Sequence, residues 1–320
     1  MSVPSLLFRR FLLLLLAAVA VAQEPVPVAN AGAPTPRRIE STLELQVELH
    51  RRGFSCGPID GVIGAQTVAA LRAFQRGAGV RESGVLDAAT HEVLRITFQA
   101  LGPYAFTAED LSGLGPVPTT WLEKSEQPGL GYASAIELAA ERFRTTPNFL
   151  RKLNPDVDWD GVLPGATVSV PEVEQALVVR PAAQLVIRLE ARELDVLDSD
   201  SRVVAHFPVS IARKAEKRPV GELHVTVTAR DPNYTFDPEV FPESAEAREL
   251  GRKLIIPPGP NNPVGRAWIG LDLPGYGIHG TPDPEKVGRT ESHGCFRLAN
   301  WDALTLIDLV RVGTPVLVEP

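Results

Sequence analysis

Residues 278–298 decide how this chain is interpreted, and they read IHGTPDPEKVGRTESHGCFRL. The stretch brings together Cys295 and two histidines, His279 and His293, with glycines beside them. A thiol becomes a useful nucleophile when a neighbouring group lowers its pKa or removes its proton, and a histidine within hydrogen-bond reach does both. The stretch therefore predicts a nucleophilic site built on a cysteine and a histidine.

The two histidines differ in how they can reach the sulfur. His279 lies at the end of a separate strand, from which it can meet the sulfur across the site. His293 is two residues from Cys295, so in an extended segment it shares a face with the cysteine. Gly294 frees the chain to present amide N–H groups to a developing oxyanion.

Three further residues are candidates for binding substrate. Gly280 removes a side chain where a substrate backbone must approach. Arg297 carries a forked cation that suits a carboxylate. Tyr276 comes just before the motif and is expected to line the cleft, although core packing explains an aromatic side chain there equally well.

Other readings of a cysteine beside histidines are a buried structural thiol and a metal site. Free cysteine is often a small buried hydrophobe, and we expect this of Cys56. A zinc site would need two histidines and one cysteine in an unusual geometry, and the chain has no C-x-x-C spacing. We expect no metal and no organic cofactor.

The residues before the motif alternate with a period of two, which predicts strands. The predicted strands are 184–189, 193–197, 203–209 and 221–228. Short strands at this spacing indicate a β-rich domain, which we place at residues 180–320.

The motif with its surroundings resembles the catalytic domain of the L,D-transpeptidases, the YkuD type. The resemblance includes residues 217–222, the proline- and glycine-rich run 257–265 and the segment 312–316. It implies a fold of mixed β-sheets with a short helix after the cysteine loop. It also implies His279 as the base, with backbone N–H groups around Gly294 and Cys295 as the oxyanion hole. By the same resemblance, His293 and Ser292 would shape the site.

The same resemblance implies a reaction on peptidoglycan. Cys295 would attack the L–D peptide bond of a tetrapeptide stem, release D-alanine and form a thioester. The acceptor stays open between the side-chain amine of diaminopimelate and a lysine of an outer-membrane lipoprotein. Water as acceptor would make the protein an L,D-carboxypeptidase, and a non-catalytic wall-binding scaffold is a further alternative. Family members are targets of carbapenems and act in cell wall biogenesis and cell shape.

Residues 41–98 are expected to form a small three-helix domain. Gly53 should end the first helix and Asp87 should cap the third. The run from Leu49 through 57–61 to 84–87 resembles the type 1 peptidoglycan-binding domain, which implies binding to the wall.

The segment between the two domains is expected to hold a linker and a second small module. Several prolines in 99–130 predict a linker. Residues 131–172 contain two short helical patterns and a closing strand, and they resemble a small α+β LysM-like glycan-binding module.

The N-terminus predicts export. Residues 1–22 combine two arginines, an apolar run and a small-residue cleavage site, which is typical of a signal peptide, and 23–40 reads as a linker. We therefore expect a protein of the periplasm or cell envelope that is soluble after cleavage. The net charge of −7 argues against a nucleic-acid partner.

Overall fold

The computed structural model describes residues 35–173, 181–240, 244–290 and 294–320, and Pro36–Pro320 form one compact unit. The predicted signal peptide at 1–22 and residues 23–34 of the predicted linker lie outside the described residues. Within the described part, no helix combines the length and the apolar character that crossing a bilayer requires.

The first group of elements is helical, as expected. It consists of α1 (Thr42–Arg51), α2 (Ala65–Gly77) and α3 (Ala88–Val93). Gly53 follows α1 with φ +87, and the Asp87 side chain accepts a hydrogen bond from the Thr90 N–H at the start of α3. The short strand β1 (Arg37–Arg38) pairs antiparallel with β2 (Arg95–Ile96), so the end of the predicted linker 23–40 is part of this group.

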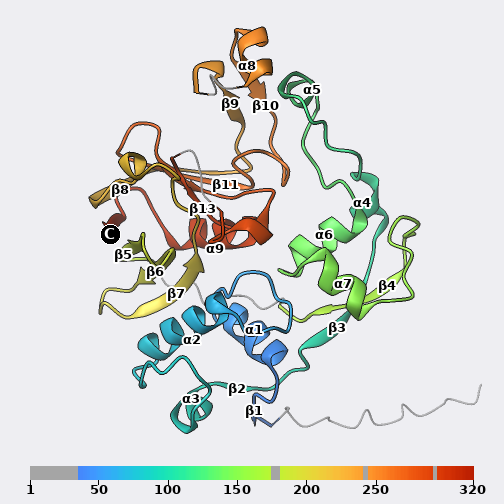
Figure 1. Cartoon of the computed structure of the whole chain (residues 1–320). Coiled ribbons are helices and arrows are strands. Elements are labelled where there is room, and N and C mark those ends of the chain that lie inside the picture. The colour runs from blue at the N-terminus through green and yellow to red at the C-terminus, as the bar shows by residue number, and fades with distance from the viewer. Residues whose placement is uncertain (1–34, 174–180, 241–243, 291–293) are drawn as a thin grey trace, which may run out of the picture. The chain divides into compact units, whose positions relative to one another are not determined.

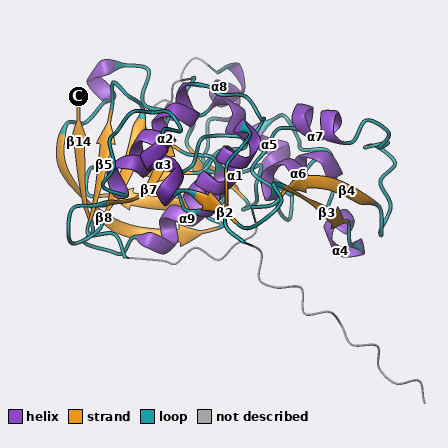
Figure 2. Ribbon diagram, turned by 90° about the horizontal axis from the view of Figure 1, so that it is seen from below, coloured by secondary structure: helices purple, strands orange, loops and turns teal. Residues whose placement is uncertain are grey.

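A second group follows, and its elements correct the prediction of a linker at 99–130. The elements are β3 (Leu101–Ala105), α4 (Ala108–Ser112), α5 (Trp121–Ser125), α6 (Ala135–Arg142), α7 (Pro147–Leu153) and β4 (Thr167–Pro171). β3 pairs antiparallel with β4, and Figure 2 shows both beside α6 and α7. Pro103 suggested a break, but a two-stranded sheet has only edge strands, where a missing N–H is tolerated.

The third group contains the predicted β-rich domain. Its main sheet runs in the order β13-β12-β11-β8-β14-β5-β6-β7. The strands are β5 (Gln184–Arg188), β6 (Glu193–Leu197), β7 (Val203–Pro208), β8 (Gly221–Arg230), β11 (Ala267–Leu271), β12 (Gly277–His279), β13 (Phe296–Arg297) and β14 (Pro315–Glu319). The pairs β12·β13 and β14·β5 are parallel and the others are antiparallel, so the sheet is mixed, as predicted.

The remaining elements of this group surround the sheet. Helix α9 (Asn300–Leu309) is the expected short helix after the cysteine loop, and it buries Leu306 and Ile307 in the same core as β5 and β11. A separate hairpin of β9 (Tyr234–Phe236) and β10 (Leu254–Ile256) carries α8 (Ala245–Leu250), and Figure 1 shows it beside α5. Short 3₁₀ turns lie at Ala215–Lys217, Pro238–Val240 and Pro284–Lys286.

A buried carboxylate joins the helical group to the main sheet. Asp195 on β6 is fully buried and accepts hydrogen bonds from His206 (2.7 Å), Arg188 (2.6 Å) and Arg76 of α2 (2.7 Å). Asp195 and His206 face each other across the β6–β7 pair. Burial by itself would raise the pKa of Asp195, but these donors together hold the pKa well below its usual range.

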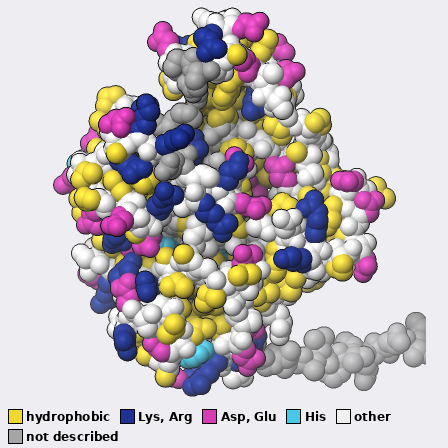
Figure 3. Space-filling model, viewed as in Figure 1, with side chains coloured by type: hydrophobic (Ala, Val, Ile, Leu, Met, Phe, Trp, Pro, Cys, Tyr) yellow, Lys and Arg dark blue, Asp and Glu magenta, His cyan; other side chains and the backbone are white. Residues whose placement is uncertain are grey.

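A second polar contact lies at the same junction. The Ser55 hydroxyl donates to Asp302 on α9 at 2.9 Å, and both residues are buried. Burial raises the pKa of Asp302 to about 7. On the surface, by contrast, Lys and Arg side chains are interspersed with Asp and Glu, as Figure 3 shows for one face.

The Asp195 cluster generates a prediction about stability. Asp195→Asn should lower the free energy of unfolding by about 3 kcal/mol at pH 7, because two guanidinium groups lose their buried counter-ion. Urea denaturation followed by circular dichroism measures this. The native pKa of Asp195 is depressed, so its stabilisation is present above the unfolded pKa of about 4 and is lost as the pH falls.

The matched control is Asp200→Asn, at an exposed position in the turn after β6. This variant should differ from wild type by less than about 0.5 kcal/mol. Equal stability of the Asp195 and Asp200 variants at pH 7 would show that the buried cluster does not hold the junction together.

Candidate active site

The predicted site residues gather around one cavity of about 850 Å³. Its lining comprises Trp121, Lys217, Ala229, Pro232, Asn233, Tyr234, Thr235, Val240, Pro263, Val264, Trp268, Gly275, Tyr276, His279, Gly294, Cys295 and Arg297. Aromatic side chains make up much of this lining, and Lys217 and Arg297 add positive charge. No acidic side chain occurs among the described residues that line it, so the cavity suits an apolar ligand that carries carboxylates.

Parallel pairing of β12 with β13 places the two central residues on one face of the sheet. Ile278 is opposite Phe296 in the register, and both side chains are buried in the core. Side chains alternate along a strand, so His279 on β12 and Cys295 just before β13 both face the other way. Both line the cavity, as the sequence analysis required of a nucleophile and its base.

Hydrogen bonding fixes the tautomer of His279. Its Nδ1 lies 2.6 Å from the carbonyl oxygen of Gly280. A carbonyl only accepts, so Nδ1 carries the proton and Nε2 keeps the lone pair that can take a proton from a thiol. The ring also stacks on Trp268, its neighbour across β11 and β12, at 5.7 Å between centroids.

Burial keeps the imidazole neutral. His279 is only 4% exposed, and its burial lowers the pKa to about 4. At neutral pH the ring is therefore unprotonated and ready to act as a base.

Burial acts on the thiol in the opposite direction. Cys295 is half-buried, and its Sγ contacts the carbonyl oxygen of Gly275 at 3.5 Å. Burial raises the pKa of Cys295, while the positive charge of Arg297 opposes this shift. The resting pair is thus a thiol and a neutral imidazole.

Arg297 follows Cys295 on β13 and is held by its backbone. Its N–H donates to the carbonyl of Ser210, and its own carbonyl accepts from the Ser210 N–H, both at 2.9 Å. Arg297 lines the cavity, while its Nε is buried with no hydrogen-bond partner among the described residues.

The other predicted residues divide into three cases. Gly294 and Tyr276 line the cavity, as expected of residues that contact substrate. Ser292 and His293 lie outside the described residues. Gly280 is buried and does not occur among the lining residues, so its contact with substrate stays a prediction.

Gly280 serves the packing behind the site. A Cβ added to it would lie 2.3 Å from Oδ1 of Asn300, so only glycine fits. Asn300 in turn donates to Glu141 on α6 at 2.8 Å and to the Pro260 carbonyl at 3.0 Å. The carbonyl that orients His279 thus belongs to a residue packed against the start of α9.

Sequence reasoning missed several lining residues. Tyr234, Thr235 and Val240 come from the β9–β10 hairpin, and Trp121 comes from α5 in the predicted linker. No spacing ties these residues to the cysteine motif, and the proline-rich surroundings of Trp121 pointed away from a site.

Comparison with known families gives two matches. The model described as "L,D-transpeptidase catalytic domain" (YkuD) matches residues 182–318. The model described as "Putative peptidoglycan binding domain" matches residues 39–94. The first match contains every lining residue from Lys217 to Arg297, and the second contains α1, α2 and α3.

Relatives with curated descriptions carry matching names. The chain is 33% identical over 139 residues to the "Putative L,D-transpeptidase YqjB" of Bacillus subtilis, covering 42% of this chain and 69% of that protein. It is 28% identical over 185 residues to the "Putative L,D-transpeptidase YkuD" of Bacillus licheniformis, covering 58% of this chain and 93% of that protein. Among solved structures, an L,D-transpeptidase from Mycobacterium smegmatis matches with a TM-score of 0.34 at 22% identity, over 50% of this chain and 65% of that one.

The two cysteines should differ sharply in reactivity. Cys295 borders the cavity, whereas Cys56 is only 3% exposed and burial raises its pKa far above the usual range. Iodoacetamide should therefore modify Cys295 in the native protein and both thiols after unfolding, as peptide mass spectrometry would show. The rate at Cys295 should rise toward alkaline pH, because its own pKa is raised.

Cys56→Ala is the matched control and should leave native labelling unchanged. Modification of Cys56 in the folded protein, or an unreactive Cys295, would contradict the geometry of the site.

Proposed function

Because the chain belongs to the L,D-transpeptidase family of cysteine-dependent acyltransferases, we propose that Cys295 is its nucleophile and His279 its base. The observation that carries this assignment is the placement of both side chains on one face of β12 and β13, in one cavity. The match to a peptidoglycan-binding domain in the same chain supports peptidoglycan as the substrate class.

The first half of the proposed reaction forms a thioester. Sγ of Cys295 attacks the carbonyl carbon of the L–D bond in a tetrapeptide stem while Nε2 of His279 takes the thiol proton. The tetrahedral intermediate then collapses, the C–N bond breaks, and the same proton passes to the departing D-alanine amine. Proton transfer during the attack is consistent with Cys295 and His279 both being neutral before substrate binds.

The second half transfers the acyl group. An incoming amine loses a proton to His279, attacks the thioester carbon and expels the Cys295 thiolate, which takes that proton back. The amine is the diaminopimelate side chain of a second stem or a lysine of a lipoprotein. Water in its place would give a carboxypeptidase.

The remaining residues are proposed to hold substrate and charge. Backbone N–H groups at Gly294 and Cys295 would stabilise the oxyanion, with Ser292 and His293 shaping the loop. A Cβ built at Gly294 would meet nothing within 4 Å, so there is open space on that side of the residue. Arg297 would bind a stem carboxylate, and Tyr276 would contact the peptide.

We propose that the modules before the catalytic domain hold the protein on the wall. Binding of the wall by residues 41–98 would raise the local concentration of a weakly bound stem. The two helices α6 and α7, followed by β4, support a LysM-like glycan-binding role for residues 131–172, although β4 pairs with β3, which lies before α4 and α5. The signal pattern of residues 1–22 supports export to the periplasm or cell envelope.

The decisive test is muropeptide analysis by mass spectrometry after incubation with purified sacculi. The wild type should remove D-alanine from tetrapeptide stems and form new cross-links, and Cys295→Ala should lose both products. Loss of at least 1000-fold is expected, because removal of a nucleophile leaves only binding and oxyanion stabilisation.

Two further outcomes bear on the alternatives. Tripeptides without cross-links would identify water as the acceptor. Absence of turnover, together with failure of a carbapenem to acylate Cys295, would favour a non-catalytic scaffold and overturn the proposal. Full activity of Cys295→Ala would overturn the mechanism itself.

The pH dependence of kcat/KM should report His279. The base must be neutral to take the thiol proton, and its pKa is lowered to about 4. Activity should therefore stay level from pH 8 down to about 5 and fall about tenfold per pH unit below about 4. Circular dichroism at each pH separates this loss from acid unfolding. An acid limb near 6.5, the ordinary histidine value, would show that His279 is not buried in this way.

A further inference from the structure

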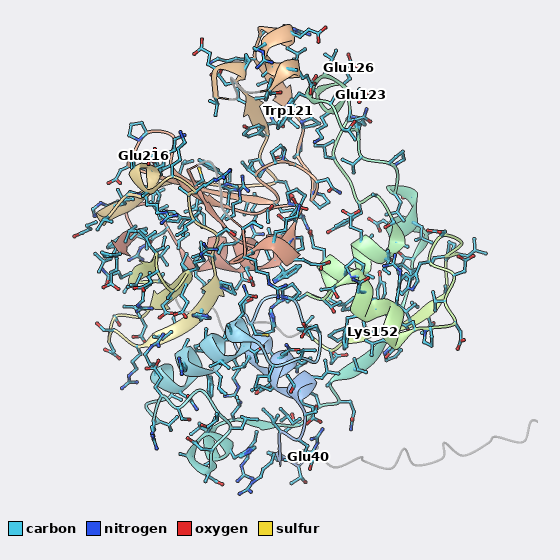
Figure 4. All side chains as sticks on the ribbon, viewed as in Figure 1. Glu40, Trp121, Glu123, Glu126, Lys152 and Glu216 are labelled. Carbon is cyan, nitrogen blue, oxygen red and sulfur yellow. The ribbon has the colours of Figure 1, made fainter. Side chains whose placement is uncertain are left out.

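One wall of the cavity comes from outside the catalytic domain. Trp121 is the first residue of α5, in the segment between β3 and α6, yet it lines the same cavity as Cys295 and His279. Figure 4 shows it between α5 and the hairpin that carries α8. A residue from the preceding module therefore takes part in the site.

Stacking holds Trp121 against the hairpin. Its indole lies 4.4 Å from the ring of Phe236, with 19° between the planes, and 6.0 Å from the ring of Tyr234. Phe236 is fully buried, and Tyr234 lines the cavity beside Trp121. Lys124 on the same helix lies over the indole at 5.3 Å.

Hydrogen bonds hold the segment from Trp121 to Leu130 in place at two points. The backbone N–H of Trp121 donates to Oε1 of Glu246 on α8 at 2.5 Å. Farther along the segment, the Leu130 N–H donates to the Pro258 carbonyl at 2.8 Å, and the Leu130 carbonyl accepts from the Asn261 N–H at 3.1 Å. Gly259 makes this second contact feasible, because a Cβ there would lie 2.1 Å from the Leu130 carbonyl oxygen.

A small apolar cluster fills the space between these two contacts. Leu130, Phe236, Ala247, Leu254 and Ile256 are buried in it, with Trp121, Tyr234 and Leu250 packed against them. The hairpin therefore draws part of its core from the segment before α6. Since Tyr234, Thr235 and Val240 line the cavity, the position of that segment fixes this side of the cavity.

We propose that Trp121 is a substrate-positioning residue whose indole packs on the aliphatic part of a bound peptide stem. The proposal rests on the proposed function. An aromatic wall offers apolar surface, and the cations Lys217 and Arg297 in the same lining would take the carboxylates of the stem. Through Trp121, the second group of elements, which runs from β3 to β4, becomes part of the substrate site.

The test compares three variants in steady-state kinetics on a soluble tetrapeptide stem. Trp121→Ala should raise KM about 10-fold and change kcat by less than about threefold, because it removes binding surface away from the reacting bond. Trp121→Phe should restore KM to within about threefold of wild type. If Trp121→Ala does not fold, KM and kcat of Trp121→Leu are compared with the wild type instead.

Leu250→Ala is the matched control. Leu250 packs in the same cluster without lining the cavity, so this variant loosens the hairpin and leaves the indole in place. Its KM should stay within about twofold of wild type. If Leu250→Ala raises KM as much as Trp121→Ala does, the tryptophan acts through packing alone and the inference fails.

The controls also separate this inference from the proposed function. Wild-type turnover and its loss in Cys295→Ala test the function. An unchanged KM in Trp121→Ala, with normal iodoacetamide labelling of Cys295, overturns only the role of the tryptophan.

Discussion

The site depends on one parallel strand contact, the pairing of β12 with β13. Register across this pair buries Ile278 and Phe296 and turns His279 and Cys295 to the opposite face. A shift of one residue in either strand would reverse its side chains and separate the imidazole from the sulfur. The apolar core thus enforces the geometry of the reacting groups, because Ile278 and Phe296 cannot leave it without a large loss of buried surface.

Burial sets the electrostatics of the same pair. Taking both groups out of water favours their neutral forms, which lowers the pKa of His279 and raises that of Cys295. The protein therefore does not store a thiolate–imidazolium ion pair in the resting site. A neutral thiol is a poor target for adventitious oxidants. The positive charge of Arg297 lies close enough to favour the thiolate once substrate excludes water.

Sequence patterns predicted the local features, but they did not predict contacts between residues far apart in the sequence. Period-two alternation located β5 to β8, and the cysteine motif identified His279, Cys295 and Arg297, because these signals lie within short stretches. The motif did not reveal that the missing side chain of Gly280 makes room for Asn300, since that contact appears only when α9 folds back on β12. Pro103 concealed β3, and nothing in the sequence links Trp121 to a hairpin more than a hundred residues later. These contacts are long-range packing, which local propensity does not encode.

The amide of Asn300 has a consequence for how such chains can diverge. It donates to Glu141 in the module before the catalytic domain, while its oxygen accepts the Arg266 N–H and fills the space left by Gly280. A recombination event that exchanged this module for one without an acceptor at position 141 would leave a buried N–H of Asn300 unsatisfied behind His279, at a cost of about 1–3 kcal/mol. The module and the domain that follows it should therefore be inherited together, or change together at this junction.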